Sequence, residues 1–461
     1  MQTLVGYLLY SFGAALLHNV GMTERIFDVK QFFFCHIKHI LSFGIYYAKF
    51  YNRYSRRVDK KRYYVIIDKT VIGEDMKYDF DTIVRRDPKS TVKWLLMKDS
   101  NPSAPDEITP FNIADMEYPT PPEIAEAVYS HMRGSILGYS VPESGYYDSV
   151  RHWMERKHGF SPKNEEFVIT PGVVPALAGA VAALTSENAS VIIMPPVYPP
   201  FRSVVTEAGR TVSECPLIRN GNKYEIDFEL FEKLCENAEM FILCSPHNPV
   251  GRVWSEDELC RMLEICTKNG VFCVADEIHH DLIMPGYRHF SVGAMPEYTD
   301  NLIICTAPSK SFNLAGMHTA NCFVSNPEKR NKLKSYFRHS GINQLGYIAC
   351  MTAYDKCENW LDECISHIDS NAHMLTGFMK ERMPEVSITP LEGTFLMWLD
   401  FSALISDEKE LKRRMNERAL FFADEGCIFG TGGRLFERVN IACPERVLKD
   451  ALGRIAEAFN S

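Results

Sequence analysis

The 14 cysteines of this 461-residue chain form no C-x-x-C pair, and they are spread from Cys35 to Cys443. Zinc ribbons and dithiol redox sites need that close spacing, so neither is indicated and no metal site is expected. A chain of this length can bury a large core without disulfides. We therefore expect free thiols, mostly buried, in a reducing cytoplasm.

An excess of positive charge is also missing. The formal net charge is −9, with 46% hydrophobic and 24% charged residues, which is ordinary for a soluble globular protein. This balance gives no broad electrostatic reason to bind nucleic acid. The length allows two domains, and no internal repeat or low-complexity tract interrupts the chain.

The first 75 residues differ from the rest, with apolar stretches at Leu4–Leu17 and Phe32–Phe50 and 11 Lys and Arg against 6 Asp and Glu. The first stretch lacks the features of a secretory signal and is short for a membrane span, and basic residues interrupt the second. A membrane-associating appendage, an extra helical element and translation upstream of the true start remain open. We favour upstream translation, because the globular pattern begins at Met76.

Apolar runs of strand length alternate with helix signals from about residue 120. The expected strands are Phe167–Thr170, Val191–Met194, Phe241–Cys244, Val271–Ala275 and Leu302–Thr306. Continuous apolar runs of this kind are typical of a mostly parallel sheet buried on both faces. The pattern predicts an α/β domain whose central sheet is covered by helices.

We expect a helix that starts at Pro121-Pro122 and stops near Gly134, a second over Pro175–Leu184, and a third after a capping box that runs from Ser255 to Glu258. After about residue 345, a long helical segment, a strand-like Gly393–Phe401 and a last helix near Glu445–Phe459 indicate a smaller α+β domain. We predict an N-terminal extension (1–75), an arm that contributes to the small domain (76–125), a large domain (126–340) and the small C-terminal domain (341–461).

Polar or otherwise special residues follow five of the expected strands: Gly172, Tyr198, Asn248, Asp276 and Lys310. Ligands of open α/β sheets bind beyond the carboxyl ends of the strands. The sequence therefore predicts one site at this edge.

Lys310 lies between Ser309 and Ser311, just beyond a buried strand. Partial desolvation there would lower the pKa of its amine and make it a nucleophile or a base, although an isolated lysine on a loop is usually a surface charge. Asp276 ends an apolar run, where a carboxylate needs a cationic or donor partner. A protonated pyridine nitrogen fits, and a helix cap or an Asp–Arg bridge remains open.

Three further side chains suit a heterocycle. Asn248 and His279 could donate to a phenolate oxygen, and Tyr198 offers a ring face for stacking. Asn248 next to proline is also a common turn residue, and an aromatic in a proline-rich loop is more often simple packing.

The loop Gly172-Val173-Val174 joins a strand to a helix, so its free N–H groups and the helix dipole suit a phosphate. The hydroxyls of Thr306 and Ser309 could add to this anion site. Arg438 stands within an otherwise apolar strand, where it would bind either a substrate carboxylate or an internal carboxylate.

Together these residues, in this order, resemble the class I/II aminotransferase superfamily of fold-type I pyridoxal-5′-phosphate (PLP) enzymes, and more narrowly the cystathionine β-lyases of the MalY/PatB type. The resemblance extends from about Tyr78 to the C-terminus. The matching segments are 113–119, 170–177, 246–254, 276–282, 306–316 and 438–444. Several motifs matching in order make the signal specific.

The resemblance implies a PLP transferase fold of type I and a role for each residue. Lys310 would bond covalently to PLP, Asp276 would pair with the pyridine nitrogen, and Arg438 would bind the substrate carboxylate. Asn248 and His279 would lie near the phenolate oxygen and Tyr198 on the ring. Tyr139 matches a tyrosine that reaches the phosphate across a dimer interface, which implies a homodimer with shared active sites.

The sequence also departs from the superfamily. His318 stands where many members have an arginine, so the phosphate site is less charged. Ser245 replaces the more usual asparagine, and Asn112 stands where tryptophan is frequent. The last two substitutions affect substrate details and leave the cofactor assignment intact.

The function implied is α,β-elimination of L-cystathionine or related cysteine S-conjugates to a thiol, pyruvate and ammonia, as part of methionine and sulfur amino-acid metabolism. Lys310 would remove the α-proton. An aminotransferase with the same residues is the alternative, because both reactions share every step up to the carbanion. A binding protein on the same scaffold would have little need for Lys310, Asp276 and Arg438 together.

Overall fold

The computed structural model describes residues 78–341 and 343–460, so the expectations for residues 1–75 and for Met76 lie outside the described part. The longer helices are α3 (Val92–Ser100), α4 (Pro122–Gly134), α5 (Ser144–His158), α6 (Val173–Leu184), α7 (Pro200–Glu207), α8 (Phe228–Cys235), α9 (Glu256–Lys268), α11 (Pro327–Phe337), α12 (Gln344–Lys356), α13 (Glu358–Arg382) and α15 (Glu445–Asn460). Two short helices are α10 (Pro308–Ser311) and α14 (Glu408–Arg413). Within the described ranges, no helix has the length and apolar character needed to cross a membrane.

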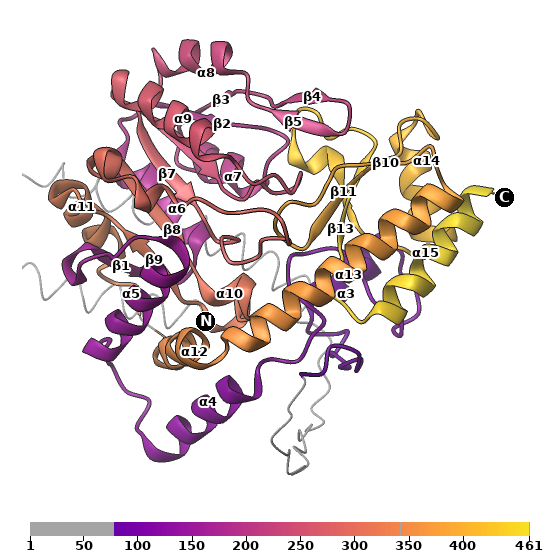
Figure 1. Cartoon of the computed structure of the whole chain (residues 1–461), viewed down its shortest axis with the longest axis horizontal. Coiled ribbons are helices and arrows are strands. Elements are labelled where there is room, and N and C mark those ends of the chain that lie inside the picture. The colour runs from indigo at the N-terminus through magenta and orange to yellow at the C-terminus, as the bar shows by residue number, and fades with distance from the viewer. Residues whose placement is uncertain (1–77, 342, 461) are drawn as a thin grey trace, which may run out of the picture. The chain divides into compact units, whose positions relative to one another are not determined.

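A seven-stranded sheet in the order β1-β9-β8-β7-β6-β2-β3 forms the centre of the fold (Figure 1). Its strands are β1 (Phe167–Thr170), β2 (Ser190–Ile193), β3 (Thr211–Glu214), β6 (Met240–Cys244), β7 (Phe272–Asp276), β8 (Leu302–Thr306) and β9 (Ala320–Phe323). Only β9 runs antiparallel to its neighbours, so the predicted mostly parallel sheet is confirmed. Each of the five expected strands agrees with the observed one to within one residue at either end.

Both faces of this sheet are buried, as the continuous apolar runs predict. On β6, Phe241 and Leu243 belong to an apolar cluster that includes residues of α9, whereas Met240 and Ile242 belong to a second cluster that includes residues of α6 and α7. Successive side chains of a strand point to opposite faces. Helices therefore cover the sheet on both sides (Figure 1).

Local signals explain where two helices begin. The capping box of α9 is present, because Ser255 Oγ accepts a hydrogen bond from the Glu258 amide (3.2 Å) and Glu258 Oε2 accepts one from the Ser255 amide (2.8 Å). Helix α6 begins at Val173, two residues before the expected Pro175. Proline is tolerated in a first helical turn, because the N–H that it lacks has no intrahelical partner there.

A second, antiparallel sheet in the order β10-β11-β13-β12 lies in the C-terminal part. Its strands are β10 (Ser387–Ile388), β11 (Leu396–Asp400), β12 (Asp424–Glu425) and β13 (Phe436–Asn440), and a separate hairpin pairs β4 (Ile218–Asn220) with β5 (Lys223–Glu225). Helices α13 and α15 pack against each other beside this sheet (Figure 1). The predicted domain boundary between residues 340 and 341 stays a prediction.

Candidate active site

The carboxyl ends of five parallel strands lie along one edge of the large sheet, because β1, β2, β6, β7 and β8 all run in the same direction. The residues that follow or end these strands are Gly172, Tyr198, Asn248, Asp276 and Lys310. Arg438 comes from β13 of the small sheet and contacts Asn248, so both sheets contribute to one group of side chains.

Lys310 lies on the one-turn helix α10, and its Nζ donates a hydrogen bond of 2.6 Å to the carbonyl oxygen of Ala114. Burial lowers the pKa of the Lys310 amine to about 8, and the positive charge of Arg438 adds to this effect while Asp115 and Asp276 oppose it. A substantial fraction of the amine is therefore neutral near pH 8. The carbonyl of Ala114 had no predicted role, although its segment was part of the resemblance.

The segment that carries Ala114 is held in a strained conformation. Ile113 has a φ of 53°, which is costly for a β-branched residue and requires support from its surroundings. Asn440 Nδ2 donates to the carbonyl oxygens of both Ile113 and Asp115, each at 2.7 Å. Asp424 Oδ2 accepts a hydrogen bond from the Ile113 amide (3.0 Å). These bonds fix the position of the carbonyl that Lys310 contacts.

Asp276 is buried at the end of β7, and its carboxylate accepts a hydrogen bond of 3.1 Å from the Ile278 amide. Burial raises the pKa of Asp276 to about 7, against an ordinary value of 3.8, although the charge of Lys310 lowers it in part. Among residues 78–341 and 343–460, no cationic side chain lies within ion-pair distance of this carboxyl. Its chemistry therefore suits a protonated ring nitrogen.

Arg438 has the internal ion pair that was left open as an alternative. Its Nε lies 3.2 Å from Asp424 Oδ2, and its Nη1 donates a hydrogen bond of 2.9 Å to Asn248 Oδ1. The register of β12 and β13 places Asp424 directly opposite Arg438. Because the carbonyl side of the Asn248 amide faces Arg438, its Nδ2 group is directed away from the guanidinium.

Several polar atoms of the site are buried without a hydrogen-bond partner among the described residues. They are Asn112 Oδ1, Ser245 Oγ, His279 Nδ1 and Thr306 Oγ1. A buried polar atom costs free energy unless it is paired, so such a group indicates a bound molecule or ordered water. Burial holds the pKa of His279 well below its ordinary value, so the imidazole is neutral at pH 7.

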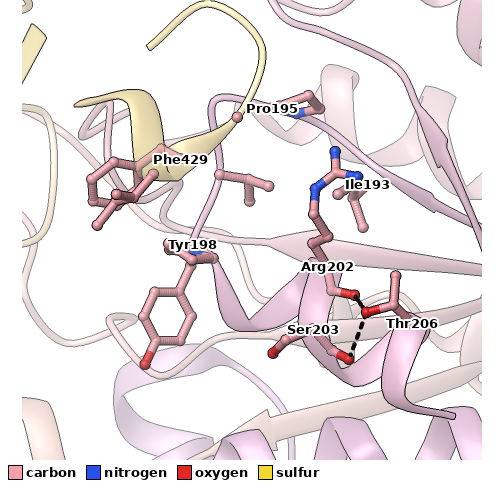
Figure 2. Close-up of a pocket in the computed structure, with 11 residues that line it drawn as sticks. Ile193, Pro195, Tyr198, Arg202, Ser203, Thr206 and Phe429 are labelled. Carbon is pink, nitrogen blue, oxygen red and sulfur yellow. Dashed lines mark hydrogen bonds between the residues drawn. The ribbon is translucent and has the colours of Figure 1, made fainter. Parts of the chain in front are cut away.

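Tyr198 begins the segment that leads into α7, and burial raises the pKa of its phenol, which therefore stays protonated. Tyr198 and Phe429 both line a pocket of about 200 Å³. Figure 2 shows these two side chains. The guanidinium of Arg438 lies 4.8 Å from the ring centroid of Phe429. The pocket therefore adjoins the arginine of the candidate site.

The predicted phosphate residues lie at the start of α6, at the end of β8 and in α10. Val173 and Val174 occupy the first turn of α6, where amide groups have no intrahelical partner, and Ser309 is partly exposed next to Lys310. Tyr139 has a fully exposed side chain between α4 and α5 and does not join these groups within the chain.

A buried cation beneath the site has no predicted role. The Lys93 side chain is 1% exposed, and its Nζ lies 2.7 Å from Glu117 Oε1 and donates to the carbonyl oxygen of Asp115 (2.9 Å). Lys93 Nζ also lies 3.2 Å from Asp115 Oδ1, and Arg86 pairs with the carboxylates of both Asp115 and Glu117. The only signal in the sequence was the closely spaced pair Asp115 and Glu117, because nothing marks Lys93 among the other lysines.

Comparison with known proteins identifies the family. The model of the family "Aminotransferase class I and II" matches residues 106–455. Cystathionine β-lyase PatB of Bacillus subtilis is 35% identical over 388 residues, which cover 83% of this chain and all of the relative.

Two solved structures are similar over most of this chain. Cystalysin from Treponema denticola, which contains a pyridoxal 5′-phosphate cofactor, has a TM-score of 0.82 and 40% identity and covers 84% of this chain and 99% of its own. The PLP-bound C-S lyase from Staphylococcus hominis has a TM-score of 0.78 and 30% identity, covering 84% and 99%.

These comparisons confirm the fold class, the PLP cofactor and the PLP-dependent carbon–sulfur lyase class that the sequence predicts. The roles of individual site residues remain predictions. The family model matches residues 106–455, and the polar residues at the strand ends and the desolvated Lys310 agree with that family. The chain belongs to the class I and II aminotransferase family.

Proposed function

We propose that this chain is a PLP-dependent carbon–sulfur β-lyase that cleaves L-cystathionine or related cysteine S-conjugates, releasing a thiol, pyruvate and ammonia. The observation that carries the proposal is the desolvated amine of Lys310, with a pKa of about 8, in one electrostatic cluster with Asp276 and Arg438. The similarity to PatB and cystalysin favours elimination over transamination.

The chemistry of the donor set fits PLP. The buried carboxyl of Asp276 suits the ring nitrogen, and the unpartnered His279 Nδ1 and the amide of Asn248 suit the phenolate oxygen. The groups proposed for the phosphate are the amides of Val173 and Val174, the loop at Gly172, and the hydroxyls of Thr306 and Ser309. The ring of Tyr198 would lie against the cofactor.

The reaction uses two of these residues directly, Arg438 and Lys310. Arg438 presents its planar guanidinium to the substrate carboxylate and so orients the α-carbon. Bound PLP supplies an electron sink that acidifies the α-proton. Lys310 accepts that proton at Nζ, which its lowered pKa permits near neutral pH. The bond between the β-carbon and sulfur then breaks, and the sulfur leaves as a thiolate.

Transamination is the second candidate, because the family model includes aminotransferases. In transamination, Lys310 would deliver the α-proton to the cofactor, and no group would leave the β-carbon. The same residues support both reactions up to that point.

A homodimer with shared active sites is part of the proposal. Tyr139 is fully exposed, and its neighbours Ile136 and Val141 are 91% and 78% exposed, which is unusual for apolar side chains in a lone chain. We assign Tyr139 to the phosphate site of a partner subunit. Mixing Tyr139→Ala and Lys310→Ala subunits tests this, because a mixed dimer would regain one complete site and hence activity. No recovery in a dimer that exchanges subunits would contradict it.

A cytoplasmic location and a role in methionine or sulfur amino-acid metabolism complete the proposal. The 13 cysteines among the described residues are free thiols, and 11 of them are buried, which suits a reducing compartment.

The deciding experiment incubates the purified protein and PLP with L-cystathionine and measures pyruvate and free thiol. We expect both products in equal amounts. Amino-group transfer to a 2-oxo acid, with neither product formed, would overturn the lyase assignment and favour the aminotransferase. Lys310→Ala should lose both activities, which separates catalysis by this site from any contaminant.

A further inference from the structure

A buried carboxylate lies behind the catalytic lysine, outside the residues assigned above. The side chain of Asp281 is 0% exposed, and it follows Asp276 and His279 in the same turn of the chain. Its Oδ2 accepts a hydrogen bond of 2.5 Å from Ser311 Oγ. Ser311 is the residue directly after Lys310, so this bond connects the turn of Asp276 with the helix that carries the lysine.

The same carboxylate also holds helix α5. Trp153 Nε1 donates to Asp281 Oδ1 at 3.0 Å, and His158 Nε2 lies 2.8 Å from that oxygen. His280 Nε2 lies 3.2 Å from Oδ2. Burial alone would raise the pKa of Asp281, but these two histidines hold it well below its ordinary value, so the carboxylate is charged. A charged and fully buried group with four partners has one well-defined position.

Helix α10 needs an external anchor, because it consists of one turn. The Phe312 amide donates to the Pro308 carbonyl oxygen (3.0 Å), which is the bond that closes that turn. A single helical turn is not stable by itself in water. Adjacent residues of a helix point about 100° apart, so Ser311 can bond to Asp281 while Lys310 reaches Ala114. The packing of Phe312 against Trp153, with centroids 5.8 Å apart, supports the same side of the turn.

His158, His280 and Asp281 also have the composition of a metal site, and a cavity of about 570 Å³ adjoins them. The two imidazole rings are stacked, with centroids 4.0 Å apart and planes within 10° of parallel. A metal ion binds in the plane of an imidazole, and two stacked planes share no such point. The geometry therefore favours a hydrogen-bond network.

We propose that Asp281 and Ser311 are positioning residues, whose hydrogen bond holds helix α10 so that the Lys310 amine is directed at the α-proton of the substrate. This inference rests on the proposed role of Lys310. Neither residue touches the reacting atoms in this account. Loss of the bond would leave binding of cofactor and substrate largely intact and would lower the rate of proton transfer.

The test compares Ser311→Ala, Asp281→Asn and the double variant in the PLP-loaded enzyme. We expect Ser311→Ala to lower kcat about tenfold, equivalent to about 1.4 kcal/mol of barrier, with KM changed less than about twofold. Ser311→Ala removes this bond and Asp281→Asn removes the charge that strengthens it, so Ser311→Ala should have a smaller effect on kcat in the Asp281→Asn background than in the wild type. Multiplicative effects on kcat in the double variant would overturn the proposal.

Ser149→Ala provides the matched control, because Ser149 lies on another part of α5 and its Oγ donates a hydrogen bond of 2.8 Å to Asp355 of α12, away from Asp281. We expect this variant to keep its kcat. If Asp281→Asn does not fold, Ser311→Ala still decides the matter, since an unchanged kcat in that variant would contradict the proposal. Borohydride trapping of the cofactor on Lys310 distinguishes failure of this inference from failure of the proposed function. If the cofactor is trapped on Lys310 and Ser311→Ala keeps a normal kcat, only the positioning role is refuted.

Discussion

Arg438 Nη1 donates a hydrogen bond of 2.9 Å to Asn248 Oδ1, and this bond connects strand β13 of the small sheet with the loop after β6 of the large sheet. One amide thus contacts the proposed carboxylate-binding arginine while its other side is directed elsewhere. We expect Asn248→Ala to raise KM for L-cystathionine about tenfold or more, because hydrogen bonds to charged groups contribute about 1.5–3 kcal/mol. Asn222→Ala, which removes an exposed asparagine, is the control. An unchanged KM would refute this link.

Arg438→Lys keeps the positive charge and loses the planar fork. Lysine cannot bond to Asp424, Asn248 and a substrate carboxylate in the geometry that the guanidinium provides. We expect KM to rise at least about tenfold, while the visible absorbance of the bound cofactor stays normal. Steady-state kinetics together with an absorbance spectrum measure both effects. Loss of cofactor with an unchanged KM would assign Arg438 to a different role.

We expect Asp276→Asn to stabilise the cofactor-free protein and to weaken the stabilisation that bound PLP provides. The pKa of Asp276 is about 7 in the folded chain and ordinarily 3.8, so the folded carboxyl binds its proton more tightly. The resulting stability is present below pH 3.8 and is lost as pH rises through 7. The neutral asparagine avoids this loss. It should therefore stabilise the cofactor-free protein at pH 8 by up to about 1.4 kcal/mol per shifted pKa unit.

Thermal unfolding at pH 5 and pH 8, with and without PLP, measures this prediction. The gain of Asp276→Asn should shrink towards pH 5, and PLP should stabilise the variant less than the wild type. Asp450→Asn, an exposed change on α15, should show neither effect. A variant that is less stable than wild type at pH 8 without PLP would contradict the raised pKa.

Lys93→Met tests the buried cation beneath the Ala114 segment. Removing it leaves Asp115 and Glu117 with Arg86 as their remaining ion-pair partner, and breaking a buried pair costs about 3–5 kcal/mol. Lys268→Met removes an ion pair whose lysine side chain is 70% exposed, and solvent screening makes the contribution of such a pair to stability small. Urea unfolding of both variants should give clearly different losses; equal losses would show that burial of Lys93 is unimportant.

The sequence predicts the large sheet well because each strand is a continuous apolar run, such as Leu302–Thr306, whose limits agree with β8. It predicts the antiparallel β9 and the break between α12 and α13 poorly. No proline or glycine marks that break at Cys357. The strands pair through tertiary contacts that a single sequence does not display.

The residues of the site can likewise be divided into those that the sequence reveals and those that it does not. Lys310, Asp276 and Arg438 are recognisable because each is a charged residue in or beside an apolar strand. Asp424 and Asp281 are not, because their partners become visible only once strands and turns are paired: β12 places Asp424 opposite Arg438, and the turn after β7 brings Asp281 to Ser311. Tyr139 is fully exposed in the single chain, so the role proposed for it requires a second subunit.

Borohydride reduction of the PLP-loaded protein, followed by peptide mapping, tests the covalent attachment on which the mechanism depends. The reduced cofactor should be found on the peptide that contains Lys310, and Lys310→Arg should remove the label while the fold is retained. A label on Lys93 or another lysine, or a folded wild-type protein that binds PLP without any reducible bond, would contradict the account.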